Sequence, residues 1–154
     1  MSRAGGFAVT GTLKAGPIDL EVLRHGEGRP ILLVHGVNPV NPKAPFLDLL
    51  AEHGAVIAPS HPGFGQSPLP DDFDTMYDLV HLYLDLLEHL RVDAVTLIGL
   101  SFGGWLAAEI AAACPHRLAK LILVDAVGIK VSDRETPDIL DVINSAPSVV
   151  QRRR

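Results

Sequence analysis

The sequence contains a single cysteine and fewer basic than acidic residues. Cys114 is alone among 154 residues, which excludes an intramolecular disulfide and a cysteine zinc cluster and favours a reducing compartment. The 13 lysines and arginines are outnumbered by 18 aspartates and glutamates, so the formal net charge is -5. This balance excludes the basic surface that binds a phosphate backbone, and we expect no nucleic-acid partner.

The sequence also lacks the long apolar segments that direct a chain to a membrane or anchor it there. Residues 1–6 show no apolar run typical of a signal peptide. The longest uncharged stretch, residues 94–108, contains Ser101 and three glycines, which is typical of a buried strand that continues into a helix. We therefore expect no membrane association and a cytoplasmic location. The 47% hydrophobic content suits one soluble globular domain.

Apolar runs and amphipathic segments alternate along the chain. Two β-prone segments, residues 7–14 and 19–25, predict an antiparallel pair. Continuous apolar runs predict strands buried on both faces of a sheet, at residues 30–35, 55–58, 95–99 and 121–124. Helical patterns lie between these runs, at residues 41–52 with Phe46, Leu49 and Leu50 on one face, at residues 75–90 with Thr75 and Asp78 in capping-box spacing, and at residues 102–113. The alternation predicts an α/β fold, in which helices cover both faces of a mostly parallel sheet.

A G-x-S-x-G sequence, Gly99 to Gly103, lies between the predicted strand at residues 95–99 and the predicted helix at residues 102–113. In this context the pattern is typical of a nucleophile elbow, a sharp turn that exposes a serine while glycines leave room for it. Ser101 is therefore the candidate nucleophile, and the helix starting at Phe102 adds a positive dipole end. The structural alternative is that the glycines only allow tight packing of the helix on the strand.

A His-Gly pair, His35-Gly36, follows the predicted strand at residues 30–35. The backbone N–H of Val37, just after this pair, can join the N–H of Phe102 in an oxyanion hole. The pair itself is a candidate for substrate binding. For the His35 side chain we favour a structural role, in which the imidazole satisfies loop carbonyls, because an oxyanion hole needs backbone donors.

Taken together, these residues resemble the α/β-hydrolase fold family. The resemblance rests on His35-Gly36 and on three further segments, residues 59–67 (PSHPGFGQS), 99–105 (GLSFGGW) and 121–126 (LILVDA). It implies that residues 1–128 form a partial core with strands one to six of the eight-stranded family sheet. Residues 129–154 would be the truncated start of a cap region or an irregular C-terminal tail.

The resemblance also assigns roles to individual residues. Ser101 would be the nucleophile, the N–H groups of Val37 and Phe102 would form the oxyanion hole, and the loop at residues 62–65 would shape the rim of the pocket. Phe64 in this loop is a candidate substrate contact, together with His35 and Gly36. We expect a small-molecule substrate, and neither a cofactor nor a metal.

A serine hydrolase also needs an imidazole base and an acid that orients it, in the chain order serine, acid, histidine. The only histidine after Ser101 is His116, which a helix rising 1.5 Å per residue carries roughly 15 Å or more from the elbow. Asp125, after the neighbouring strand, is the candidate acid, with loop capping as the alternative. We expect neither His35 nor His61 to be the base, and we expect solvated side chains at His25, His53, His81 and His89.

These observations predict a serine hydrolase that acts on ester-like substrates through an acyl-enzyme at Ser101. Without the catalytic histidine, we expect this chain to show little or no turnover. The motifs fit an ester, an amide, a thioester or a carbon–carbon bond alike, because the cap and late loops that select among them are missing. A frameshift, a gene-model error or a deliberate fragment would also explain the short chain.

A non-catalytic interaction module is the alternative to an enzyme. The predicted strand at residues 121–124 would lack the neighbour that pairs with it in the family sheet. An unpaired apolar strand is prone to associate with another strand, so we expect self-association near Leu121.

Overall fold

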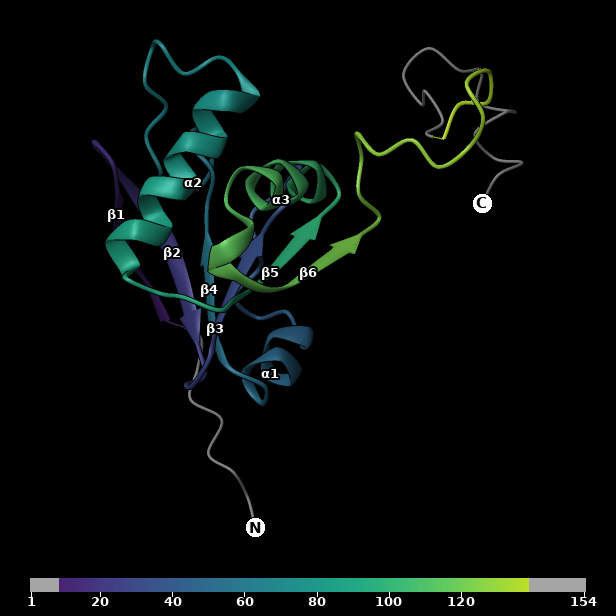
Figure 1. The fold of residues 1–154 in the computed structure, drawn as a ribbon. Coiled ribbons are helices and arrows are strands. Elements are labelled where there is room, and N and C mark those ends of the chain that lie inside the picture. The colour runs from purple at the N-terminus through teal and green to yellow at the C-terminus, as the bar shows by residue number, and fades with distance from the viewer. Residues whose placement is uncertain (1–8, 139–154) are drawn as a thin grey trace.

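The structure is a computed structural model that describes residues 9–138. Its centre is a six-stranded sheet with the strand order β1-β2-β4-β3-β5-β6 (Figure 1). The strands are β1 (Val9–Ala15), β2 (Ile18–His25), β3 (Pro30–Val34), β4 (Ala55–Pro59), β5 (Val95–Leu100) and β6 (Leu118–Val124). β1 and β2 are antiparallel, β2 is antiparallel to β4, and the other four strands are parallel. The predicted α/β class is confirmed.

Helices cover both faces of this sheet (Figure 1). They are α1 (Phe46–Ala51), α2 (Met76–Leu90), α3 (Phe102–Ala113) and the short 3-10 helix η1 (Pro115–Arg117). One buried cluster packs α2 and α3 on the sheet, and a second packs α1 on the opposite face. The predicted capping box of α2 is present: the Thr75 hydroxyl accepts from the Asp78 N–H, and the Asp78 carboxylate accepts from the Thr75 N–H. Among the described residues, no helix combines the length and hydropathy needed to cross a bilayer.

The helix predicted at residues 41–52 is shorter than expected. Helix α1 has only six residues, with Pro45 at its N-cap and a turn before it in which the Ala44 N–H donates to the Asn41 carbonyl at 2.9 Å. Proline disfavours helical backbone in the residue before it, so the sequence around Pro42 and Pro45 delays the helix. The predicted apolar face is also wrong, since Leu47 is buried while Leu49 is 64% exposed.

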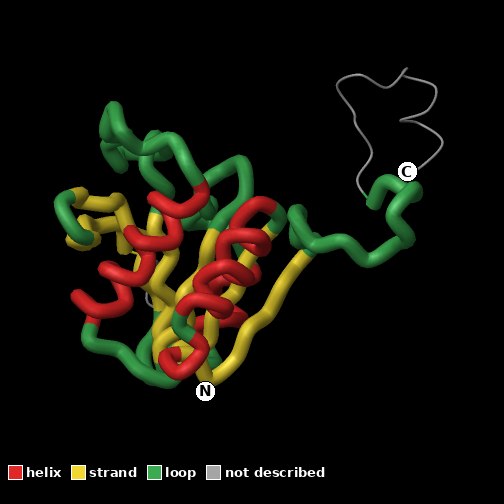
Figure 2. Tube along the Cα trace, turned by 45° about the horizontal axis from the view of Figure 1, so that its top comes forward, coloured by secondary structure: helices red, strands yellow, loops and turns green. Residues whose placement is uncertain are grey.

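β6 forms one edge of the sheet and leaves much of its apolar surface uncovered. Its last four residues, Leu121 to Val124, are between 37% and 42% exposed. After β6, residues 126–128 still pack against α3, since a Cβ on Gly104 would collide with Ala126 and one on Gly128 with Trp105. Beyond them, the described chain runs away from the sheet (Figures 1 and 2). The helical turns predicted at residues 139–143, and the arginines at the end of the chain, lie outside the described residues.

Candidate active site

The candidate site lies where the order of strands reverses. β3 pairs with β4 on one side and with β5 on the other, and the helices that follow β3 and β5, α1 and α3, lie on opposite faces of the sheet. The loops that leave β3 and β5 therefore diverge and open a crevice at the carboxyl edge of the strands. The sequence predicts His35-Gly36 and Ser101 at this edge, and the structure brings them together there.

Ser101 stands on a sharp turn between β5 and α3. Its backbone has φ 54° and ψ -114°, a conformation that is uncommon for a residue with a side chain. Glycines make the turn sterically feasible: a Cβ at Gly99 would lie 2.7 Å from the Cβ of Ala107, and one at Gly103 would collide with the carbonyl oxygens of Val34 and His35. The G-x-S-x-G pattern thus has the strand-turn-helix context that the sequence predicts.

Neighbouring elements fix the position of this turn. The Ser101 N–H donates to the Val124 carbonyl at 2.9 Å, and the Ser101 carbonyl accepts from the Val127 N–H at 3.1 Å. On the other side, a Cβ placed on Gly36 would lie 3.1 Å from the Ser101 Cβ and 3.7 Å from its Oγ. The loop after β3 therefore packs directly against the candidate nucleophile.

The predicted oxyanion donors flank this serine. Phe102 is the first residue of the 12-residue helix α3, and N–H groups in the first turn of a helix have no acceptor within it. Val37 follows Gly36, and both residues line the same cleft as Phe102. Their roles as donors stay predictions.

Two buried histidines lie behind the loop after β3. The rings of His35 and His61 are 3.8 Å apart. The His61 backbone N–H donates to His35 Nε2 at 2.8 Å, and His61 Nε2 donates to the His35 carbonyl at 2.9 Å. Tyr83 on α2 completes the network by donating its hydroxyl to His61 Nδ1 at 2.8 Å, while His35 Nδ1 donates to the Gly36 carbonyl at 2.8 Å. These partners assign one neutral tautomer to each ring.

Burial keeps this network uncharged. Desolvation lowers the pKa of His35, and desolvation together with the neighbouring His35 lowers the pKa of His61 to about 3. Burial also raises the pKa of the Tyr83 phenol. Since all four ring nitrogens have partners, neither imidazole is free to accept a proton from Ser101 in this arrangement.

The other histidines lie away from the crevice, and one of them departs from expectation. His25, expected to be solvated, is only 8% exposed, and its Nε2 pairs with the Asp48 carboxylate at 2.8 Å. The cause is tertiary, because β2 ends beside α1, which carries Asp48. The side chains of His53, His81, His89 and His116 are at the surface, and no histidine in the described part of the chain hydrogen-bonds to Ser101.

Asp125 follows β6 at the same sheet edge, with a positive φ of 46°. Its side chain is exposed, and its carboxylate makes no hydrogen bond to the described residues. The capping alternative therefore has no support among those residues. The catalytic role of Asp125 stays a prediction.

A cleft of about 470 Å³ opens beside the crevice. It is lined by the predicted substrate contacts Gly36 and Phe64, by Val37 and Phe102, and by residues at the start of α2. The His35 side chain lies behind this surface and is 1% exposed.

Sequence reasoning missed the role of Tyr83 in the buried histidine network. Its only visible signal in the sequence is one polar atom on an otherwise aliphatic helix face.

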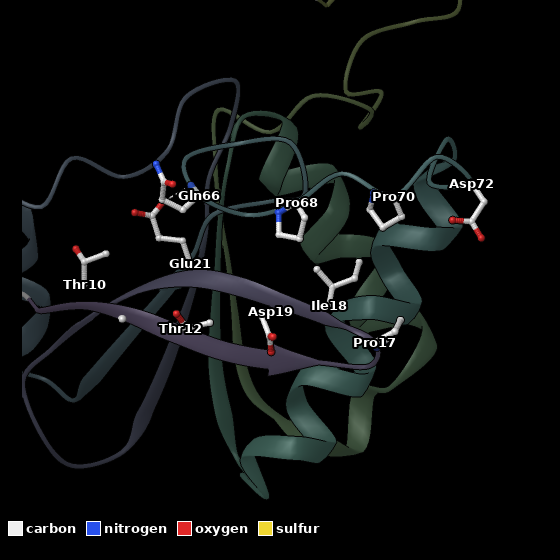
Figure 3. Close-up of a pocket in the computed structure, with 11 residues that line it drawn as sticks. Thr10, Thr12, Pro17, Ile18, Asp19, Glu21, Gln66, Pro68, Pro70 and Asp72 are labelled. Carbon is white, nitrogen blue, oxygen red and sulfur yellow. Dashed lines mark hydrogen bonds between the residues drawn. The ribbon is translucent and has the colours of Figure 1, made fainter.

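A larger hollow lies elsewhere on the molecule. It measures about 930 Å³ and lies between the β1–β2 hairpin and the loop at residues 66–72 (Figure 3). Thr12, Asp19 and Glu21 line it from the hairpin, and Gln66 and Asp72 from the loop. None of the residues around Ser101 contributes to it, so size alone does not identify the site.

Comparison with known proteins now places this geometry in a family. The family model of the alpha/beta hydrolase fold matches residues 29–148, and the chain belongs to this family. It is 37% identical over 147 residues to a 2-hydroxy-6-oxo-2,4-heptadienoate hydrolase of Pseudomonas putida, covering 91% of this chain and 52% of that protein. It is 34% identical over 135 residues to a 2-hydroxymuconate semialdehyde hydrolase of the same species, covering 84% of this chain and 47% of that one.

A solved structure supports the same assignment. The 2-hydroxy-6-oxo-6-phenylhexa-2,4-dienoate hydrolase of Rhodococcus sp. strain RHA1 superimposes with a TM-score of 0.70 at 26% identity, covering 82% of this chain and 49% of that one. The chain thus spans about half the length of the curated relatives it matches.

Proposed function

We propose that this chain carries the nucleophile and oxyanion half of a serine hydrolase that cleaves ester-like carbonyl substrates. The observation that carries the proposal is the position of Ser101 on the elbow between β5 and α3, with the glycine loop after β3 packed against it. Relatives with hydrolase names, which share this family, add support.

In the proposed reaction, Ser101 Oγ attacks the carbonyl carbon and its proton passes to a general base. The N–H groups of Val37 and Phe102 stabilise the oxyanion, and one such donor contributes about 3 kcal/mol in acyl transfer. The tetrahedral intermediate then collapses to acyl-Ser101 and releases the leaving group, which takes the proton. Water hydrolyses the acyl-enzyme in a second cycle of the same kind.

The general base has to come from outside residues 9–138. Each imidazole near Ser101 is buried, neutral and bonded at both nitrogens, and the remaining histidines lie away from the crevice. We therefore expect little or no ester turnover by the chain alone. Removal of a triad base takes away most of the rate enhancement of a serine hydrolase, which is the reason for this expectation.

Labelling with a fluorophosphonate probe tests the proposal. The purified chain would be treated with the probe beside Ser101→Ala, with circular dichroism on both to establish folding. Slow labelling confined to Ser101, made faster by added imidazole as an external base, is the expected result. A folded chain that does not react with or without imidazole, or that labels equally in Ser101→Ala, would contradict it.

A second candidate function is that of an interaction module, which the exposed strand β6 favours. Its Leu121 to Val124 segment is apolar and has no strand on its outer side among the described residues. We propose that a second copy of the chain pairs with it. Sedimentation should then show a dimer that Ile122→Lys converts to monomer, because charge on an edge strand opposes pairing. Leu49→Lys, at an exposed position on α1, is the control, and a monomer at every concentration would exclude the pairing.

A further inference from the structure

The cleft beside Ser101 has an unusual concentration of aromatic side chains. Three of the five phenylalanines and the only tryptophan of the chain line it: Phe64, Phe73, Phe102 and Trp105. The rings of Phe102 and Trp105 meet edge to face at 6.2 Å. Aromatic rings favour such offset and edge contacts with a further ring, so this lining suits an aryl group.

Among residues 9–138, no cation lines the same cleft. Asp74 is the single charged side chain of these residues that lines it, and none of their lysines or arginines does so. His61 also faces the cleft but is neutral, since its pKa lies at about 3 and both ring nitrogens are bonded. A carboxylate that entered this space would lose its hydration without gaining a partner, which is strongly unfavourable.

The start of α2 does not supply an anion site in place of a cation. Helix N-termini attract anions, but this one already carries two carboxylates, Asp74 and Asp78. The Asp78 carboxylate accepts a hydrogen bond from the Thr75 N–H at 2.8 Å and another from the Thr75 hydroxyl at 2.6 Å. The charge at this end of the cleft is therefore negative.

From these observations we infer that the cleft takes an uncharged aryl group of the substrate, and that any carboxylate of the substrate lies outside it. The volume suffices: an apolar cavity of about 150 Å³ holds benzene, and this cleft measures about 470 Å³. The inference rests on the proposed function only for identifying the occupant as substrate. The carboxylate named in the Pseudomonas putida relative's dienoate substrate would find no counterion among the described residues that line this cleft.

Trp105 provides a direct readout of binding. It is the sole tryptophan, it lines the cleft, and its side chain is 36% exposed. Phenylacetone, an uncharged aryl ketone, would be titrated against the chain while the Trp105 fluorescence is recorded. Its partner probe is (4-carboxyphenyl)acetone, which has the same shape with a carboxylate on the ring.

We expect a saturable fluorescence change with phenylacetone and binding at least about tenfold weaker with the carboxylated ketone, because an unpaired buried charge is costly. Asp74→Lys, at an exposed position, should narrow or reverse this difference by supplying a cation. Phe73→Ala should weaken phenylacetone binding, whereas Leu49→Ala on the opposite face should not. Equal binding of both probes, or no saturable binding by a folded chain, would overturn the inference.

Ser101→Ala separates this inference from the proposed function. Ketone binding is expected to survive in that variant, because the cleft does not need the nucleophile to hold a ring. Phenylacetone binding without any fluorophosphonate labelling of the unsubstituted chain would contradict the proposed hydrolase function but would still support the aryl preference of the cleft. Fluorophosphonate labelling of Ser101 together with equal binding of both ketones would support the proposed hydrolase and contradict the aryl preference of the cleft.

Discussion

The turns that follow β5 and β6 lie at the same edge of the sheet and are joined by the bond from the Ser101 N–H to the Val124 carbonyl. Each has a residue with positive φ, 54° at Ser101 and 46° at Asp125. Glycines and the two neighbouring strands, β3 and β6, confine the first turn, whereas the Asp125 side chain is exposed and the chain beyond residue 128 leaves the sheet. The described residues thus fix the backbone of both turns, but they make no hydrogen bond to the carboxylate of the candidate acid.

The strands β5 and β6 also differ, in their pairing and in the burial of their side chains. β5 pairs with β3 and β6 and is largely buried, while β6 pairs only with β5 in the described part of the chain and exposes its apolar side chains. A nucleophile needs a rigid support, because catalytic groups must be held close to one geometry. Ser101 is therefore held by β5, by the loop after β3, and by two backbone hydrogen bonds to the turn after β6.

Gly99→Ala tests that rigidity most severely. Its Cβ would lie 2.7 Å from the Ala107 Cβ and would collide with the Gly103 carbonyl, and neither backbone can move without displacing the elbow. We expect a loss of about 4 kcal/mol in the free energy of unfolding, measured with denaturant, which is at the upper end for an overpacked site.

Gly11→Ala on β1 is the matched control, since a Cβ there meets nothing within 4 Å. It should change the stability by less than about 1 kcal/mol. Similar losses in the two variants would mean that the elbow is as tolerant as the edge of the sheet.

Acid should destabilise the folded chain through His61, which follows β4 and is hydrogen-bonded to His35 after β3. Its pKa is about 3 when folded and about 6.5 when unfolded, so between these values the unfolded chain binds the extra proton. Stability contributed by neutral His61 is therefore complete above pH 6.5 and decreases as the pH falls towards 3. At about 1.4 kcal/mol per pKa unit, the loss by pH 4 is roughly 3 kcal/mol.

Nuclear magnetic resonance of the imidazole nitrogens checks this expectation directly. The His61 ring should remain neutral from pH 7 to the point of unfolding, with Nε2 protonated as its donation to the His35 carbonyl requires. His53→Gln, at an exposed position, helps to assign the remaining signals. A His61 resonance that titrates near the ordinary value while the chain stays folded would refute the buried network.

Tyr83→Phe probes the same network with a smaller change. The substitution removes the hydroxyl that donates to His61 Nδ1 and leaves a buried acceptor without a partner. We expect the free energy of unfolding to fall by about 1 to 3 kcal/mol. Tyr77→Phe on the same helix, 73% exposed, should have an effect below about 0.5 kcal/mol. Equal effects would show that the Tyr83 hydroxyl contributes nothing beyond ring burial.

The elbow and the strands could be predicted because their signals are local. The glycines of G-x-S-x-G and the apolar run at residues 95–99 adjoin each other, so sequence spacing alone indicates a strand, a turn and a helix. The helix before β4 was harder, since Pro42 and Pro45 act against the apolar spacing around them. The apolar spacing therefore predicts a longer helix than the structure contains, because a proline disfavours helical backbone in the residue before it.

Contacts between distant residues could not be predicted in this way. His25 with Asp48 and His61 with Tyr83 are separated by 23 and 22 positions. Each pair forms only because a helix packs on a particular strand, which no local pattern encodes. The sequence therefore supports a structural role for His35, but it does not indicate the tyrosine that completes the network.

Asp125→Asn is the smallest of the expected changes and bears most directly on the difference between the two turns. Because its exposed carboxylate makes no hydrogen bond to the described residues, we expect stability to change by less than about 0.5 kcal/mol. Fluorophosphonate labelling of Ser101 should also be unchanged, since no imidazole is present for the carboxylate to orient. A marked loss of stability would reveal a structural partner of Asp125. A loss of labelling without a loss of stability would mean that the Asp125 carboxylate increases the reactivity of Ser101 in this chain. The turn after β6 would then be part of the active site.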